Sequence, residues 1–216
     1  MKTTALNTSR KCILRLSQYR DALLRLKAEG FVKIFSDILG EAVNVTPAQV
    51  RKDFSIFGIS GNKRGGYDIG SLLARLDDIL GKHEQQSAIL VGAGNLGVAL
   101  MHHKAFEQRG IRIMAAFDKD PARHGGQNGI PVLPMGDLPA FVERHSVKAG
   151  ILCVPADAAQ EVLDAMIAAG IKGVLSFAPI QLKTPHEFIL NTINVDIELE
   201  NIMYFVSAAE KHGSVV

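Results

Sequence analysis

Hydrophobic residues recur at helical spacing in the first third of the chain and then form short apolar runs separated by amphipathic stretches. Over residues 10–27 they lie among arginines near the helical period, which predicts an amphipathic helix that Gly30 ends. Ser36 before Asp37 predicts the N-cap of a second, short helix that continues to Val43. We therefore expect a small helical unit here.

The next helix has a strong start signal. Asn44 breaks the preceding helix. Thr46 then supplies an N-cap, Pro47 suits the first turn because its missing N–H is not needed there, and Gln49 occupies the capping-box position. This helix is expected to continue to Phe57. Two short helices joined by so few residues predict a helix-turn-helix.

The second helix of this pair is expected to have one inward and one outward face. Val50, Phe54 and Phe57 lie on one side and would pack inward. Arginine and glutamine can read base edges, and lysine and serine can hold phosphate, so the opposite side suits a DNA major groove. A solvated surface helix is the alternative. The outward residues are Gln49, Arg51, Lys52 and Ser55.

A glycine-rich segment, residues 58–67, follows this helix and carries Lys63 and Arg64 near its tip. A β-hairpin directly after a recognition helix is a wing, and these two cations would meet the DNA backbone or the minor groove. A flexible loop is the competing interpretation. An amphipathic helix over residues 68–80 completes the unit, and the polar stretch 81–86 marks a domain boundary.

From residue 89 onward, apolar runs alternate with amphipathic stretches, which predicts a doubly wound parallel sheet. The fold class is therefore α/β: a winged-helix domain over residues 1–83, a Rossmann domain over 84–195 and a C-terminal dimerisation helix over 196–216. The expected strands are residues 89–91, 111–117, 130–133, 149–154 and 173–177. The expected helices between them are residues 95–108, 138–145 and 158–169.

The first of these strands leads directly into a Gly-x-Gly-x-x-Gly turn that opens a helix. Bare glycine backbone at such a turn suits a dinucleotide pyrophosphate. Asp118 ends the second strand, where this fingerprint places the carboxylate that holds the adenosine ribose hydroxyls. An acid there favours NAD over NADP, although Lys119 and Arg123 lie nearby. The residues of the turn are Gly92, Ala93, Gly94, Asn95, Leu96 and Gly97.

Ligands of doubly wound sheets bind at the carboxyl ends of the strands, so two further strand ends are expected to border the nicotinamide end of the site. Cys153, in the first of them, invites a redox-thiol hypothesis, but a buried structural thiol is the favoured interpretation. His103, with His102 beside it on the helix after the turn, would also lie near the site. The strand-end residues are Val154, Pro155, Phe177 and Ala178.

The segment after the last strand bears on the choice between an enzyme and a sensor. A dehydrogenase needs a proton donor and a substrate pocket, usually from a further domain. Here only residues 181–196 and a last helix over 196–211 follow, so we expect a nucleotide sensor without catalytic residues. An NAD-dependent dehydrogenase with an N-terminal dimerisation domain is the alternative, and an interaction module is a third. The last helix has a broad apolar face that is expected to pack on another subunit.

The net charge of +2 conceals an asymmetry. Residues 1–83 contain 14 Lys and Arg against 8 Asp and Glu, a net +6, and the rest contain 10 against 14, a net −4. This split favours a polyanion partner for the front unit, although a solvated basic surface gives the same count. No stretch reaches the ~20 apolar residues of a membrane helix, and residues 1–11 lack the apolar core of a signal peptide, so we expect a cytoplasmic protein. Two distant cysteines without a Cys/His cluster predict neither a disulfide framework nor a metal site.

Several motifs together resemble the Rex family of bacterial redox-sensing transcriptional repressors. They are QVRKDFS at 49–55, FG at 57–58, GY at 66–67, GAGNLG at 92–97, GVLSFAP at 173–179 and NVD at 194–196. The resemblance covers nearly the whole chain. It implies a homodimer that binds an inverted-repeat, double-stranded DNA operator, with NADH or NAD+ as regulatory ligand and C-terminal helices exchanged between subunits. It also implies that NADH binding releases the operator and derepresses genes of fermentative or anaerobic energy metabolism.

The resemblance also assigns roles to individual residues. Asp118 would hold the adenine ribose, below a pyrophosphate held by the glycine turn. Arg15 and Asp196 match two positions that help couple the domains across the dimer. His103 stands where the family commonly has a tyrosine associated with the nicotinamide pocket. Other departures are Ser60 for an aromatic residue, Arg64 for a glycine and Ser176 for an asparagine. The positions that would face the operator are Arg51, Lys52, Ser55, Lys63 and Arg64.

Overall fold

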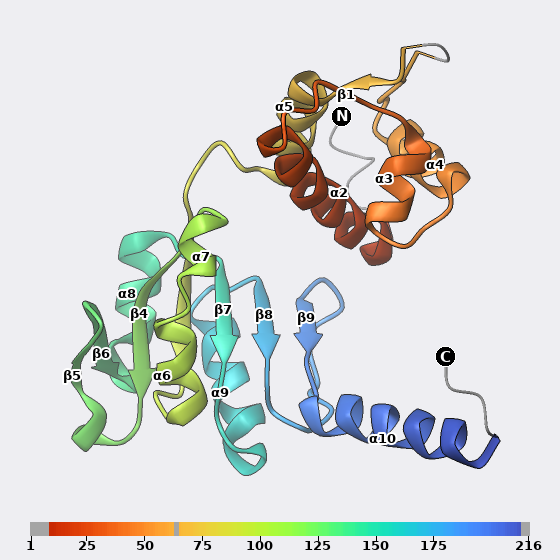
Figure 1. Ribbon diagram of the computed structural model, residues 1–216. Coiled ribbons are helices and arrows are strands. Elements are labelled where there is room, and N and C mark those ends of the chain that lie inside the picture. Colours follow the sequence, from red (N-terminus) through yellow and green to blue (C-terminus); the bar gives the residue numbers. More distant parts are fainter. Residues whose placement is uncertain (1–8, 63–64, 213–216) are drawn as a thin grey trace. The chain divides into compact units, whose positions relative to one another are not determined.

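The computed structural model describes residues 9–62 and 65–212 (Figure 1). The chain divides into two compact units, Met1–Glu84 and Gln85–Val216. The first is helical with a small β-ribbon, and the second is built on a seven-stranded sheet with helices on its faces. The α/β fold class expected from the sequence is confirmed.

Helices of the N-terminal unit surround one apolar core, and a short β-ribbon lies beside them (Figure 1). Tyr19 and Phe54 are fully buried at its centre, with ring centroids 5.4 Å apart in an edge-to-face arrangement. In the ribbon, β1 pairs antiparallel with β2. The elements of this unit are α2 (Arg10–Ala28), β1 (Lys33–Ile34), α3 (Ser36–Ala42), α4 (Pro47–Ile56), β2 (Tyr67–Asp68) and α5 (Ile69–Leu80).

Helix α4 begins as the sequence predicts. Thr46 Oγ1 accepts a hydrogen bond from the Gln49 backbone N–H at 3.2 Å, and Pro47 occupies the first turn. In the turn before it, Asn44 has φ 57°, a left-handed conformation that asparagine tolerates. A Cβ atom at Gly40 would lie 2.6 Å from the Val45 carbonyl oxygen, so the end of α3 packs directly on this turn. The α3–turn–α4 segment is a compact helix-turn-helix.

Two capping predictions are wrong. Phe35, in an extended conformation, precedes α3 without a side-chain cap, and Ser36 is the first helical residue. The Ser36 hydroxyl instead accepts a hydrogen bond from Arg51 Nη1 at 2.7 Å, which links α3 to α4. Gln49 does not complete a capping box, because its amide donates to the charged Asp53 Oδ1, one turn later, at 2.8 Å.

Asp53, on α4, is a buried carboxylate that the sequence analysis did not single out, since only 1% of it is exposed. Arg15 donates to it through Nε at 2.6 Å and Nη2 at 2.7 Å. The Tyr19 hydroxyl donates at 2.9 Å and Cys12 Sγ at 3.4 Å. All three donors belong to α2, so this Asp53 network fixes α4 against α2.

The charges in the Asp53 network are well defined. Burial opposes ionisation of Asp53, but hydrogen bonds from Arg15, Tyr19 and Gln49 outweigh it and hold its pKa below the usual 3.8. Burial, followed by the neighbouring Asp53 charge, raises the pKa of the Cys12 thiol to about 11. The network at neutral pH is therefore an Asp53–Arg15 ion pair with neutral donors around it.

In the segment after α4, two described residues pair with each other. Asn62 and Gly66 make an antiparallel bridge, in which the Gly66 N–H donates to the Asn62 carbonyl at 2.8 Å. Gly66 has φ 65° and would place a Cβ atom 2.4 Å from the Ile34 carbonyl oxygen, so only glycine fits there. Lys63 and Arg64 lie outside the described residues.

The C-terminal unit is a sheet of order β5-β6-β4-β3-β7-β8-β9, parallel except for β5 (Figure 1). Its strands are β3 (Gln86–Val91), β4 (Ile111–Asp118), β5 (Gly125–Gln127), β6 (Ile130–Pro134), β7 (Ala149–Leu152), β8 (Gly173–Ser176) and β9 (Ile189–Thr192). Its helices are α6 (Asn95–Met101), α7 (Ala105–Gln108), the 3-10 turns η1 (Pro121–Arg123) and η2 (Met135–Asp137), α8 (Leu138–His145), α9 (Ala156–Ala168) and α10 (Val195–His212).

Side chains of β3 alternate between two cores, one on each face of the sheet. Ile89 and Val91 belong to the core that contains Leu163 of α9. Leu90 belongs to the opposite core, with Met101 of α6. The sheet is therefore covered on both faces, and the parallel strands β3, β4 and β7 end at the same edge.

The helix predicted over residues 95–108 is interrupted. The His103 N–H donates to the Leu100 carbonyl at 3.1 Å, three residues back, and His102 Nδ1 lies 2.7 Å from the Val98 carbonyl oxygen. This tightened last turn ends α6, and α7 starts separately at Ala105. The strands β5 and β9 were not predicted, since each is short and lies at an edge of the sheet.

Helix α10 exposes nearly all of its side chains. Asn194 Oδ1 caps it by accepting the N–H groups of Asp196 at 3.1 Å and Ile197 at 3.2 Å. Over residues 195–211, every residue except Ala208 is exposed. The large apolar residues among them are Val195, Ile197, Leu199, Ile202, Met203, Tyr204, Phe205 and Val206. A surface of this kind marks an interaction site.

Replacing Asp53 by Asn should lower the free energy of unfolding by about 3 kcal/mol, because Arg15 would keep its charge beside a neutral amide. The folded pKa of Asp53 lies below 3.8, so its ionised form stabilises the fold above about pH 4, and this stabilisation is lost as pH falls through the folded pKa. Urea unfolding across this pH range measures both effects. Exposed Glu41→Gln is the control, and equal stability of Asp53→Asn and the parent would contradict the role of the network.

Candidate functional site

The glycine turn between β3 and α6 is fixed by contacts that allow no side chain. Gly92 has φ 100°, and a Cβ atom there would lie 2.3 Å from the Cys153 carbonyl oxygen. A Cβ atom at Gly97 would lie 1.9 Å from the Gly92 carbonyl oxygen. The Gly92 N–H donates to the Phe117 carbonyl at 2.8 Å, which ties the turn to the end of β4. The first and third glycines therefore shape the turn.

The second glycine is less closely packed than the other two. A Cβ atom at Gly94 would meet only Arg123 Nη1, at 3.3 Å. In the dinucleotide fingerprint the second glycine allows the pyrophosphate to approach the backbone. The side of Gly94 that this fingerprint assigns to the pyrophosphate is covered only by the half-exposed side chain of Arg123.

Asp118 ends β4 beside the turn, with 6% of it exposed. Its Oδ2 accepts the Ala93 N–H at 2.7 Å and Arg123 Nη1 at 3.2 Å, and its Oδ1 accepts the Asp120 N–H at 2.9 Å. Burial opposes the charge, but the backbone hydrogen bonds from Asp120 and Ala93, with Arg123 nearby, lower the pKa of Asp118. The carboxylate is therefore ionised at neutral pH and available as an acceptor.

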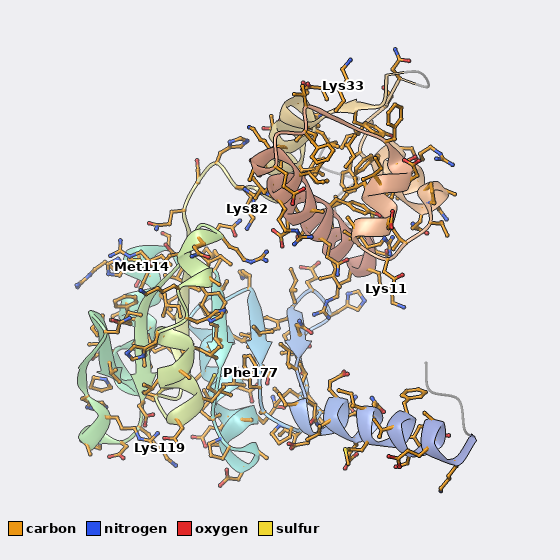
Figure 2. All side chains as sticks on the ribbon, in the orientation of Figure 1. Lys11, Lys33, Lys82, Met114, Lys119 and Phe177 are labelled. Atoms are coloured by element: carbon orange, nitrogen blue, oxygen red, sulfur yellow. The ribbon has the colours of Figure 1, made fainter. Side chains whose placement is uncertain are left out.

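A cavity of about 230 Å³ opens where β3, β4 and β7 end. Four of the site residues expected from the sequence line this cavity: Gly92, Asp118, Val154 and Pro155. Figure 2 shows Lys119 just beyond the end of β4, at this edge of the sheet, and Lys119 also lines the cavity. Residues that the sequence analysis left out of the site include Arg123, Met135, Asp157 and Val162.

Other selected residues lie around or away from this cavity. Ala93, Asn95 and Leu96 belong to the glycine turn and the start of α6. Ala178 is fully buried in the core with α9, so it offers no surface to a ligand. Phe177, labelled in Figure 2, follows β8. It is half-buried against the core that contains Leu90 and Met101.

The structure does not bring His103 to the glycine turn. Its ring lies 5.1 Å from that of Phe106, edge to face, in a separate cavity of about 350 Å³. Ile111 lines this second cavity, whereas Asp118 lines the first, so the two lie at opposite ends of β4. The interruption after α6 places His103 there.

Cys153 lines the cavity at the ends of β3, β4 and β7. Burial raises the pKa of its thiol to about 12. A lowered pKa is typical of redox-active cysteines, so the raised pKa of Cys153 favours the structural interpretation of this thiol. Among the described residues, no group of three or more histidine, cysteine or acidic side chains is arranged to hold a metal ion.

The outward face of α4 is exposed at Arg51, Lys52 and Ser55. The Ser55 hydroxyl donates to the Lys52 carbonyl at 2.8 Å. Two of the outward residues are also engaged within the unit: the Gln49 amide donates to Asp53 at 2.8 Å, and Arg51 Nη1 donates to the Ser36 hydroxyl at 2.7 Å. The face therefore presents a hydroxyl and two cations, with the glutamine turned toward the Asp53 network.

Arg15 and Asp196 lie in different surroundings. Arg15 forms a bidentate ion pair with Asp53 inside its own unit. Asp196 is exposed in the first turn of α10.

No described helix combines the length and the hydropathy required to cross a membrane.

A helix-turn-helix unit with a wing, joined to a doubly wound sheet with a dinucleotide turn, defines the class of two-domain transcription regulators that carry a Rossmann domain. A family model described as "Putative DNA-binding protein N-terminus" matches residues 7–55, and one described as "CoA binding domain" matches residues 83–180. The chain belongs to the Rex family of redox-sensing transcriptional repressors. The family expected from the sequence is thus confirmed. The expected function, a transcriptional repressor and not the alternative dehydrogenase, is confirmed as well.

Relatives match over nearly their whole length. The redox-sensing transcriptional repressor Rex of Desulforamulus reducens is 37% identical over 208 residues, which cover 96% of this chain and 99% of the relative. That of Desulfitobacterium hafniense is 40% identical over 90% of this chain and 93% of its own. The crystal structure of RSP, a Rex-family repressor, with beta-NAD+ and operator DNA has a TM-score of 0.89 at 33% identity and covers 95% of both chains. The crystal structure of RSP with beta-NADH has a TM-score of 0.84 at 33% identity, and the match covers 96% of this chain and 98% of the RSP chain.

Replacing Gly92 by Ala should destabilise the C-terminal unit by about 3 kcal/mol, because alanine at a strongly positive φ is strained and its Cβ meets the Cys153 carbonyl. Thermal unfolding followed by circular dichroism measures this loss. Gly136→Ala is the matched control, since a Cβ atom there meets nothing within 4 Å. If both variants unfold at the same temperature, the close approach at Gly92 is not a constraint on the fold.

Proposed function

We propose that this protein is a homodimeric repressor that binds an inverted-repeat DNA operator and releases it when NADH binds. The observation that carries this proposal is the combination, in one chain, of an open glycine turn beside ionised Asp118 with a capped, cation-bearing helix α4. The relatives support it, because RSP has been crystallised both with beta-NAD+ and operator DNA and with beta-NADH. The protein acts in the cytoplasm, where its operator is accessible.

NADH or NAD+ is held as a regulatory ligand at the edge of the sheet. The turn from Gly92 to Gly97 holds the diphosphate, and Asp118 accepts hydrogen bonds from the ribose hydroxyls of the adenosine half. Val154, Pro155 and Phe177 lie toward the nicotinamide end. His103 is left out of this set, because its cavity lies at the other end of β4. The two redox forms differ in the charge of the nicotinamide ring, so the switch rests on their different affinities for two dimer arrangements.

DNA is held by α4 and the wing. Arg51 reads base edges, while Lys52 and Ser55 bind phosphate. Lys63 and Arg64 extend the contact from the wing. Gln49 reads a base only after its amide leaves Asp53, so its contribution is conditional on the Asp53 network.

The second copy of the chain is held by α10. Its exposed apolar residues, from Val195 to Val206, are those that a partner protomer would cover. Exchange of this helix between protomers also brings Asp196 of each chain to the other, where Arg15 is its expected partner. A dimer with two recognition helices matches an operator with two inverted half-sites.

A gel shift on an inverted-repeat operator at fixed salt tests the switch. We expect saturating NADH to weaken operator binding by at least about tenfold, whereas NAD+ at the same concentration leaves it nearly unchanged, because only a difference in affinity can shift the dimer. Operator binding that is indifferent to saturating NADH would overturn the sensor function. It would leave a DNA-binding protein.

Substituting Arg51 by Ala should reduce operator affinity by about tenfold and relax the preference for one base position, since a direct base contact is lost. Lys63→Ala should instead weaken binding to all sequences and reduce the slope of log affinity against log salt by about 1. Fluorescence anisotropy with operator and scrambled DNA separates the two effects. Exposed Arg144→Ala, on α8, is the control. Parental affinity in both variants would mean that the DNA face lies elsewhere.

A further inference from the structure

Arg123 lines the cavity at the ends of β3, β4 and β7, although the fingerprint does not require it. It ends η1, five residues after Asp118, and 45% of its side chain is exposed. Its Nη1 lies 3.2 Å from Asp118 Oδ2, and its Nε lies 3.6 Å from Asp120 Oδ2. The same Nη1 lies 3.3 Å from the position of a Cβ atom at Gly94. The guanidinium thus spans the distance between the ribose acceptor and the glycine turn.

The hydrogen bonds of Asp118 show why this arrangement has to change when a nucleotide binds. A carboxylate offers about four acceptor positions. Three are already used, by the N–H groups of Ala93 and Asp120 and by Arg123. Two ribose hydroxyls need two positions. The backbone donors are fixed by the fold, so the half-exposed Arg123 is the donor that has to leave.

We propose that Arg123 is a nucleotide-binding residue that exchanges Asp118 for the 5′-diphosphate of the dinucleotide. This inference rests on the proposed function, since it requires a nucleotide at the glycine turn. A guanidinium presents a planar fork of donors that matches phosphate oxygens. Its position over Gly94, where the pyrophosphate approaches the backbone, places it beside the diphosphate as soon as the ribose takes Asp118.

The exchange explains how one cavity holds both a carboxylate and a diphosphate. In the free protein, Arg123 forms ion pairs with Asp118 and Asp120. When the dinucleotide binds, the ribose hydroxyls satisfy Asp118 and the guanidinium meets the new negative charge. A cation next to Asp118 is also what a 2′-phosphate would require, but the position of Arg123 Nη1 beside the second glycine of the turn favours the 5′ side.

The test compares three ligands on the full-length protein and its Arg123→Ala variant: 5′-ADP, adenosine and 2′-AMP. Ligand-observed NMR titration gives a dissociation constant for each. We expect Arg123→Ala to bind 5′-ADP about tenfold more weakly, because one charge-assisted hydrogen bond to phosphate is lost. Adenosine should bind equally or more tightly, since its ribose no longer competes with Arg123. The affinity for 2′-AMP should follow that of adenosine.

Two further variants make the result specific. Arg123→Lys keeps the charge but not the fork, and should recover part of the affinity for 5′-ADP. Arg144→Ala, an exposed arginine outside the cavity, should leave all three affinities unchanged. Unchanged affinity of Arg123→Ala for 5′-ADP would overturn the inference. Equal weakening of adenosine and 5′-ADP would assign Arg123 a structural role, and weakening of 2′-AMP alone would assign it to a 2′-phosphate. Failure of the unaltered protein to bind NADH would instead contradict the proposed function.

Discussion

The position of the recognition helix depends on a buried charge. Asp53 sits on the inward side of α4, where an unpaired carboxylate would cost several kcal/mol. Helix α4 is therefore stable only where Arg15 and Tyr19 of α2 reach that carboxylate. This pairing therefore also determines where Arg51 and the other outward residues of α4 lie. Donors that never face DNA thus determine the geometry of the surface that does.

A second carboxylate, Asp118, plays a different role in the C-terminal unit. Two of its donors are backbone N–H groups, which the fold fixes, and the third is the half-exposed Arg123. Asp53 is sealed by its partners, whereas Asp118 keeps one partner that a ligand can replace. The first arrangement gives rigidity to the DNA-binding unit, and the second gives the nucleotide site the capacity to respond.

Local signals allowed much of this structure to be predicted. Thr46 and Pro47 start α4 through contacts within one turn, and the glycine turn with Asp118 follows a spacing set by the fold class. The Asp53 network could not be predicted, because its α2 donors lie 34 to 41 residues away in sequence. The position of His103 beside a second cavity depends on the break after α6, which no sequence signal marked. Arg123 acquires its role only through the folding of its loop over Gly94.

The raised thiol pKa values have a consequence for the kind of signal that this repressor can register. With pKa values of about 11 for Cys12 and about 12 for Cys153, less than about one thiol in a thousand is thiolate near neutral pH. Hydrogen peroxide and electrophiles attack thiolates, so neither cysteine is a ready target. The redox signal of this repressor is therefore better carried by the bound nucleotide than by either thiol, since both thiols stay protonated and Cys12 serves as a donor to Asp53.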